Sequence, residues 1–237
     1  MLNDYKKISS IIVALDFNNK NDALLMAKKL DPSLCNLKVG LELFLSCGPS
    51  IIDELHNIGY KIFLDLKFHD IANTVVKSCM FASKLGVWMT NIHASAGKKT
   101  ILSAAKELSS TNKKMILLGV TILTSLDDSD LVELGYKFNI ENQILKMSDL
   151  CFESGLNGIV CSANEAKFVK SKFEKNFICV CPGIRMLDDN KNDQKRVSTP
   201  SIAKSNGADY IVVGRSITTN PNPLDSLIKI KNEFDGI

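Results

Sequence analysis

The chain has 237 residues, of which 45% are hydrophobic and 23% charged, and its formal net charge is +3 at pH 7. This length and hydrophobic content allow a substantial buried core in one barrel or two smaller domains. The charge is too small to indicate nucleic-acid binding, and no Lys/Arg run suggests a polyanion surface. No opening signal segment or membrane-length apolar run is evident, so we expect a cytoplasmic protein with no membrane partner.

Cysteine and histidine usage argues against metal chemistry. The seven cysteines are odd in number, lie mostly in apolar contexts and form no Cys-x-x-Cys pair. This pattern indicates free buried thiols rather than disulfides, metal ligands or a nucleophile. His56, His69 and His93 do not have the spacing of zinc ligands. We therefore expect no metal site.

Apolar strands and amphipathic helices alternate along the whole chain. The predicted strands cover residues 11–17, 37–40, 61–68, 88–93, 115–123, 158–161, 177–180 and 208–213. The predicted helices cover residues 21–30, 49–58, 70–85, 98–108, 128–134, 142–154, 164–170 and 199–206, with one more at the C-terminus. The helix over 70–85 is expected to be capped by Asp70 and to bury a stripe formed by Ile71, Val75, Cys79 and Ala82.

Eight strand–helix units with continuous apolar strands favour a parallel sheet covered on both faces. In a chain of this length they predict an α/β fold, a single (β/α)8 TIM barrel that spans residues 1–237. An open doubly wound sheet is the alternative, but no Gly-rich dinucleotide turn follows the first strand. The polar loop over 187–195 is expected to be either a mobile lid or an ordinary surface loop.

The most informative stretch is residues 62–74, where an apolar run leads directly into charged residues. Alternate side chains of a strand share a face, so Asp65 and Lys67 lie together at the C-terminal end of this strand. Charges on a buried strand face are costly unless they are paired or functional. For each residue alone, a structural ion pair or a helix cap at Asp70 is a sufficient explanation. Because all three occur at one strand-to-helix junction, we favour a functional site.

Polar residues also lie on or just after the C-terminal ends of other predicted strands, where the functional sites of such barrels are found. They are Asp16, Lys38, Thr124, Arg185 and Arg215. The loops after strands seven and eight often bind phosphate in this fold. Gly214 allows close backbone approach, and the Arg215 guanidinium suits phosphate oxygens. The pattern favours a phosphorylated small-molecule substrate.

Several of these stretches together resemble the bacterial orotidine 5′-phosphate decarboxylase family, over nearly the whole barrel from about Ile11 to Ile217. The matching residues are 14–16, 37–40, 65–71 with Thr74, 123–125, 182–185, 193–196 and 213–215. The Asp-x-Lys-x-x-Asp core is shared with related sugar-phosphate enzymes, whereas the following Ile-x-x-Thr and the Pro-Gly-Ile-Arg and Asp-Gln stretches are more specific. Met186, Asn192 and Ser216 depart from the family pattern, which affects only the expected shape of local loops.

The resemblance implies a carboxy-lyase that converts orotidine 5′-monophosphate to UMP and carbon dioxide, the last step of de novo pyrimidine nucleotide biosynthesis. It implies no metal or organic cofactor. Lys67 would protonate C6 of the pyrimidine, and Asp65 would face the substrate carboxylate. Lys38, Asp65, Lys67 and Asp70 would form an array of alternating charge.

The resemblance also implies the substrate contacts and the assembly. Its expected substrate-binding residues are Asp16 and Lys38 at the ribose, Thr124 and Ser125 near the base, Gln194 from the lid, Arg185, Gly214 and Arg215 at the phosphate end, together with Asp65, Ile71 and Thr74. The enzyme would be a homodimer in which Asp70 and Thr74 reach into the site of the other subunit.

Two other functions remain open at this stage. A sugar-phosphate lyase or aldolase would place the carboxylates of the same motif around magnesium, and chelator sensitivity would identify it. A non-catalytic nucleotide-phosphate binding protein would keep Gly214 and Arg215 but would need neither Asp65 nor Lys67. We expect any association with the preceding phosphoribosyltransferase to involve a separate chain.

Overall fold

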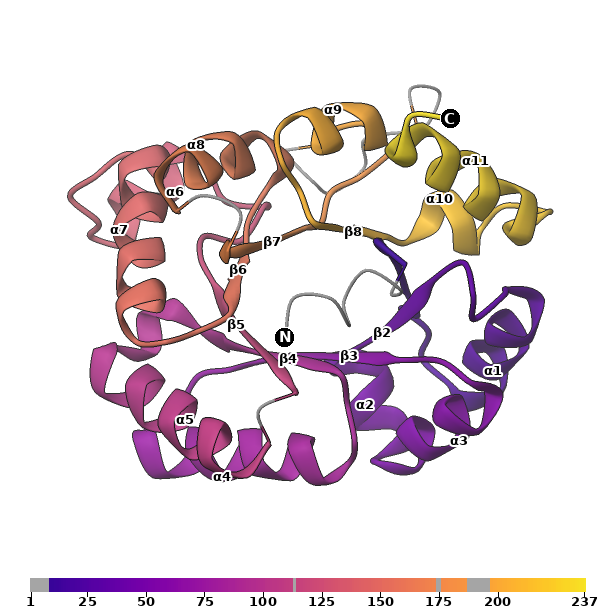
Figure 1. Cartoon of the computed structure of the whole chain (residues 1–237), viewed down its shortest axis with the longest axis horizontal. Helices are drawn as coiled ribbons and strands as arrows, with labels where there is room; N and C mark the ends of the chain where they lie inside the picture. The colour runs from indigo at the N-terminus through magenta and orange to yellow at the C-terminus, as the bar shows by residue number, and fades with distance from the viewer. Residues whose placement is uncertain (1–8, 113, 174–175, 187–196) are drawn as a thin grey trace.

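The computed structural model describes residues 9–112, 114–173, 176–186 and 197–237. Within these ranges eight parallel strands close into a barrel in chain order, from β1 beside β2 round to β8 beside β1. Figure 1 looks down this barrel and shows the helices arranged around the ring of strands. The predicted (β/α)8 barrel is confirmed.

The strands are short, and most end close to the predicted positions. They are β1 (Ile11–Ala14), β2 (Asn36–Gly40), β3 (Ile62–Phe68), β4 (Met89–His93), β5 (Ile116–Val120), β6 (Gly158–Val160), β7 (Ile178–Cys181) and β8 (Tyr210–Val213). The first and fifth strands end earlier than predicted. Asp16, predicted on the first strand, therefore lies in the loop after β1, and Thr124 lies in the loop after β5 as predicted.

The helices that cover the barrel are α1 (Lys20–Lys29), α2 (Leu41–Cys47), α3 (Ser50–Ile58), α4 (Ala72–Lys84), α5 (Lys98–Thr111), α6 (Asp128–Glu133), α7 (Ile140–Glu153), α8 (Ala163–Phe173), α9 (Pro200–Ser205), α10 (Arg215–Thr218) and α11 (Pro223–Asp235), with a short 3-10 helix η2 (Ala94–Ala96). Helix α2 was not predicted; it buries Leu43 and exposes Leu41 and Leu45. A helix with so little apolar periodicity leaves a weak signal.

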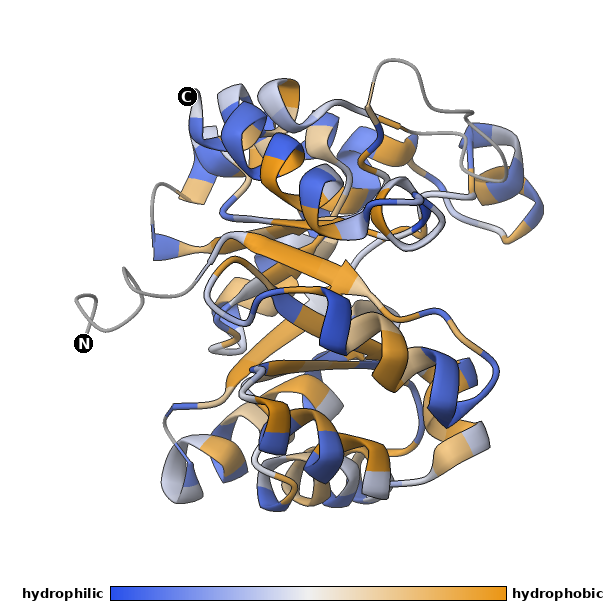
Figure 2. Cartoon of the chain, turned by 90° about the vertical axis from the view of Figure 1, so that its right-hand side faces the viewer, coloured by the Kyte–Doolittle hydropathy of each residue, from blue (hydrophilic) through white to orange (hydrophobic). Residues whose placement is uncertain are grey.

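Alternate strand residues separate two apolar layers. On β1, Ile11 and Val13 pack against the helices, whereas Ile12 points into the barrel. Phe63 fills the interior from β3 in the same way. Figure 2 shows the resulting pattern, with hydrophobic strands in the middle and hydrophilic residues on the outer faces of the helices. The side chains above this interior packing, at the C-terminal strand ends, form the site.

The start of α4 differs from the prediction. Its N-cap is Ile71, which makes no side-chain capping bond, and the Asp70 carboxylate accepts a hydrogen bond from the neighbouring backbone N–H of Ile71, at 2.6 Å. Val75, Cys79 and Ala82 are buried as expected, but Ile71 is 72% exposed. The interpretation of Asp70 as the cap and of Ile71 as part of the buried stripe is therefore wrong. The extended strand and its loop carry the chain outward before the helix begins.

In the part of the chain that the structure describes, no helix combines the length and apolar character needed to cross a bilayer.

Candidate active site

A cavity of about 850 Å³ opens at the C-terminal ends of the strands. It is lined by the predicted residues Asp16, Lys38, Asp65, Lys67, Thr124, Ser125, Arg185, Gly214 and Arg215. These residues come from six different strand ends and are brought together only by closure of the barrel. The structure thus gathers most of the predicted site residues around one space.

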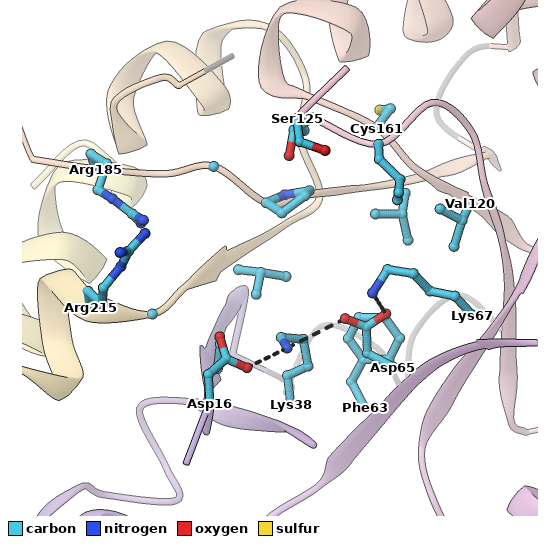
Figure 3. A pocket seen from close by; sticks show the side chains of 18 of the residues that line it. Asp16, Lys38, Phe63, Asp65, Lys67, Val120, Ser125, Cys161, Arg185 and Arg215 are labelled. Carbon is cyan, nitrogen blue, oxygen red and sulfur yellow. Dashed lines mark hydrogen bonds and ion pairs between the residues drawn. The ribbon is translucent and has the colours of Figure 1, made fainter. Parts of the chain in front are cut away.

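Four charged side chains form a continuous chain of ion pairs along one wall of the cavity (Figure 3). Lys38 Nζ lies 3.0 Å from Asp16 Oδ1 and 3.5 Å from Asp65 Oδ2. Lys67 Nζ lies 2.9 Å from Asp65 Oδ1. The Asp65 carboxylate is therefore held between two ammonium groups, and the pairing of Asp65 with Lys67 expected from strand alternation is confirmed.

Burial and neighbouring charges have opposite effects on the pKa values of Asp65 and Lys38, the two central residues of these ion pairs. Burial alone raises the pKa of the Asp65 carboxyl, but Lys38, Lys67 and the hydrogen bonds it accepts outweigh burial and lower its pKa below the ordinary value. Burial alone lowers the pKa of Lys38, but the attraction of Asp65 and Asp16 raises it overall. Both groups are therefore charged at neutral pH, and the cavity wall carries fixed charges before any ligand binds.

Lys67 has a backbone conformation that is unusual for its residue type. Its φ is +51°, and it is the one non-glycine residue with positive φ in the described chain. Such a conformation costs roughly 1–3 kcal/mol and persists only where surrounding contacts hold it. The register between β3 and β4 also shifts between Leu64 and Phe68. At this irregular point of β3 the Lys67 side chain lines the cavity and its Nζ contacts Asp65.

Asn91 on β4 is a residue that the sequence analysis did not identify. It is fully buried, its Nδ2 donates to Asp65 Oδ1 at 2.7 Å, and its Oδ1 accepts from the backbone N–H of Lys67 at 2.8 Å. The available signal was an amide side chain inside the predicted strand over 88–93, because a buried amide needs partners. The identity of those partners depends on the pairing of β3 with β4.

The opposite end of the cavity is strongly basic. In Figure 3 the side chains of Arg185 and Arg215 point toward one another, on the far side of the cavity from Lys67 and Asp65. Arg185 is 8% exposed and donates from Nη1 to the Ile184 carbonyl oxygen at 2.9 Å, whereas Arg215 is exposed at the start of α10. Two converging guanidinium groups favour a ligand with more than one negative charge, such as a phosphate.

Apolar and hydroxyl side chains separate the two charged ends. Phe63, Val120 and Val212 line the cavity from inside the barrel, together with Ile122. Thr124 and Ser125, Thr218 and Thr219 add hydroxyl groups at the rim. An apolar cavity with polar groups at both ends fits a flat ring joined to a phosphate through a polar linker.

Three of the predicted residues that the structure describes, Asp70, Ile71 and Thr74, are not part of this cavity. Asp70 and Ile71 line a second, more open cavity of about 600 Å³, and Thr74 is exposed on α4. Within one subunit, Asp70 therefore lines a different cavity from Lys67. Gln194 and the predicted lid over 187–195 lie outside the described residues.

The described residues contain no group of three His, Cys, Asp or Glu side chains placed to hold one metal ion. The Asp65 carboxylate contacts the ammonium groups of Lys38 and Lys67 and accepts a hydrogen bond from the Asn91 amide. All seven cysteines are free thiols, and six of them are buried, as predicted.

Comparison with known proteins connects this geometry to one family. The model of the Orotidine 5'-phosphate decarboxylase / HUMPS family matches residues 9–230. The chain is 48% identical over 225 residues to orotidine 5'-phosphate decarboxylase of Buchnera aphidicola subsp. Schizaphis graminum (strain Sg), covering 95% of each chain. It is 47% identical over 226 residues to the enzyme of the same name from Nitrosomonas eutropha, covering 95% of this chain and 97% of the relative.

Solved structures agree with the sequence relatives. The crystal structure of orotidine 5'-phosphate decarboxylase from Lactobacillus acidophilus superposes with a TM-score of 0.84 at 36% identity, over 96% of this chain and 99% of that one. An uncharacterized conserved protein from Geobacillus kaustophilus gives a TM-score of 0.81 at 34% identity, over 94% of this chain and 99% of that one. The chain therefore belongs to the orotidine 5'-phosphate decarboxylase family.

Proposed function

We propose that the protein decarboxylates orotidine 5′-monophosphate to UMP and carbon dioxide without a metal or organic cofactor. The observation that carries this proposal is the chain of ion pairs around the buried Asp65, with Lys67 Nζ at 2.9 Å from Asp65 and two arginines at the other end of the same cavity. A metal-independent decarboxylation needs a fixed cation at the reacting carbon and an anchor for the phosphate. Membership of the family supports the same reaction.

In the proposed step the bond between C6 and the carboxylate breaks and its electron pair stays on C6. The Lys67 ammonium supplies the proton that C6 takes up, and carbon dioxide leaves. Because Lys67 is already held beside Asp65, its charge stabilises the developing carbanion without reorganisation. Each tenfold acceleration requires about 1.4 kcal/mol of transition-state stabilisation.

Asp65 lies beside Lys67 and is proposed to face the substrate carboxylate. Its lowered pKa keeps it charged, so two negative groups would meet in the bound state and separate as carbon dioxide leaves. Binding energy from the distant phosphate would hold them together. The paired ammonium of Lys38 stabilises Asp65 throughout, and Lys38 and Asp16 are proposed to contact the ribose hydroxyls.

The phosphate is proposed to bind Arg185, Arg215 and the backbone at Gly214. Gly214 precedes α10 and lines the cavity between these arginines and Asp16. Thr124 and Ser125 are proposed to lie near the base, and Gln194 to close over it from the loop that follows Arg185.

We further propose that residues 1–237 form one domain of a cytoplasmic homodimer that performs the last step of de novo UMP synthesis. Asp70, Ile71 and Thr74 are exposed on one side of the chain. They would meet the substrate site of the other subunit, where Asp70 would extend the array of Lys38, Asp65 and Lys67. This arrangement accounts for their absence from the cavity of their own chain.

The decisive experiment mixes the purified protein with orotidine 5′-monophosphate and excess chelator and follows the ultraviolet absorbance of the pyrimidine. Rapid conversion to UMP is expected, because no proposed step uses a metal. No conversion, together with magnesium-dependent activity on a pentulose or hexulose phosphate, would replace this proposal with a sugar-phosphate lyase. Binding of UMP without turnover of either substrate would favour a binding protein.

A further inference from the structure

The pairing of β3 with β4 is irregular beside Asp65 and Lys67, and it leaves Asn91 alone opposite this segment. Leu64 is paired with Thr90 and Phe68 with Ile92, so β3 places three residues, Asp65 to Lys67, against Asn91 alone. A regular ladder cannot bond all the backbone groups of such a bulge. The side chain of Asn91 supplies a missing acceptor, because its Oδ1 receives the backbone N–H of Lys67 at 2.8 Å.

The second half of the same amide binds Asp65. Asn91 Nδ2 donates to Asp65 Oδ1 at 2.7 Å, the same oxygen that Lys67 Nζ approaches at 2.9 Å. The orientation of the amide is determined by its partners, since the Lys67 N–H can only donate and the Asp65 carboxylate can only accept. Asn91 thus spans the backbone of one charged residue and the side chain of the other.

We propose that Asn91 is the positioning residue of the reaction, and this inference rests on the decarboxylation proposed above. It holds Lys67 at φ +51°, which carries the ammonium into the cavity, and it fixes the carboxylate plane of Asp65. Asn91 is fully buried and does not line the cavity, so it acts through these two residues and not on the substrate.

An uncharged amide suits this position for an electrostatic reason. It adds a donor to Asp65 without competing for the charges of Lys38 and Lys67. A carboxylate of the same shape would keep the acceptor for the Lys67 N–H but would repel Asp65 at hydrogen-bond distance. Two such carboxyl groups would share one proton, which the pH dependence of the reaction would reveal.

The test compares Asn91→Ala, Asn91→Asp and the control Thr90→Val. Thr90 is the adjacent residue of β4, is equally buried and donates from Oγ1 to the Leu64 carbonyl oxygen of β3 at 3.0 Å, but does not line the cavity. Thr90→Val therefore removes one buried hydrogen bond between the same two strands. For each protein, kcat and KM for orotidine 5′-monophosphate, the Kd for UMP and the melting temperature are measured.

Asn91→Ala is expected to lower kcat by roughly 100-fold, the size of effect that a small misplacement of reacting groups produces. The Kd for UMP should change less than about threefold, since the phosphate contacts are untouched and UMP lacks the carboxylate that meets Asp65. Thr90→Val should lose thermal stability and keep kcat. A kcat for Asn91→Ala no lower than that of Thr90→Val would overturn the inference.

Asn91→Asp provides the readout that a purely structural role would not change. Its kcat should rise as the pH falls, because only a protonated carboxyl at position 91 can donate to Asp65, and the wild type should lack this dependence. A wild-type pH profile in this variant would contradict the inference. Since Asp is isosteric with Asn, this variant also decides the question if Asn91→Ala does not fold.

A structural measurement separates this inference from the proposed function. If the wild type does not decarboxylate the nucleotide, the reaction is wrong, and a crystal structure of Asn91→Asp at a pH above the titration of the pair then judges Asn91. Loss of the positive φ at Lys67, or of the contact between Lys67 Nζ and Asp65, would support positioning by Asn91. Retention of both would overturn it.

Discussion

At the scale of single residues, the cationic side chains that line the cavity form two separate groups. Lys67 belongs to the chain of ion pairs, whereas Arg185 and Arg215 meet at the far end (Figure 3). A cation beside the reacting carbon affects the barrier, and a cation at the phosphate affects mainly binding. Substitutions at the two ends should therefore separate kcat from KM.

Lys67→Ala is expected to lower kcat by at least ~10³-fold, because it removes both the proton donor and the fixed charge. Binding of UMP should remain largely intact, since the phosphate and ribose contacts are unchanged. Steady-state kinetics and calorimetric titration with UMP measure the two effects. A variant that retains more than a few per cent of the activity would refute Lys67 as the proton donor.

Arg215→Ala should weaken the binding of UMP by about 10- to 100-fold, in line with the loss of charged hydrogen bonds worth about 1.5–3 kcal/mol. Uridine, which has no phosphate, is the matched ligand and should bind the variant and the wild type alike. Titrations of both ligands test the assignment. Equal UMP affinity in the two proteins would exclude Arg215 as the phosphate anchor.

At the scale of secondary-structure elements, close contact between short strands sets the shape of the barrel. β6 has three residues and is paired with β7 through Gly158 and Ile178. A Cβ at Gly158 would lie 2.1 Å from the backbone oxygen of Ile178. Backbone atoms cannot yield as a flexible side chain can, so this position requires glycine.

Gly158→Ala is expected to lower the free energy of unfolding by about 3 kcal/mol, the upper part of the usual range for overpacking. Gly135→Ala is the control, because its Cβ would meet nothing within 4 Å and only its φ of +78° opposes the substitution. It should cost roughly 1–2 kcal/mol. Denaturant unfolding of both variants measures the difference, and equal losses would show that the strand contact is not limiting.

At the scale of the whole molecule, one chain provides most of the predicted site around its cavity and exposes Asp70, Ile71 and Thr74 on its surface. Asp65 and Lys67 face the cavity, while Asp70 and Thr74 are exposed outside it. The proposed homodimer would bring the two groups together, with each subunit completing the site of the other. The assembly then becomes part of the catalytic mechanism.

Subunit mixing tests this assembly. Lys67→Ala and Asp70→Ala should each be inactive alone, but co-refolded mixtures should regain activity because a mixed dimer holds one intact site. With random pairing, half of the dimers are mixed, so about one quarter of the wild-type activity is expected. Each variant refolded alone is the control. No gain on mixing would show that Asp70 does not act across an interface.

Sequence patterns alone were enough to predict the barrel and most of the residues that line the cavity. Side-chain period follows directly from backbone geometry, so apolar runs and amphipathic stretches identified the alternating strands and helices. Parallel strands present their C-terminal ends at one rim, so Asp16, Lys38, Asp65, Lys67 and Arg215 were predicted to share a site before any distance was known.

The positions and contacts of Asn91, Asp70 and Ile71 became evident only in the folded barrel. The partners of Asn91 lie 24 and 26 positions away, and the irregular register of β3 brings them within hydrogen-bond distance. The extended segment before α4 places Asp70 and Ile71 outside the cavity. Strand register and the direction of a connecting segment depend on packing across the whole barrel, because many distant contacts determine them together. The local periodicity of the sequence does not identify those contacts.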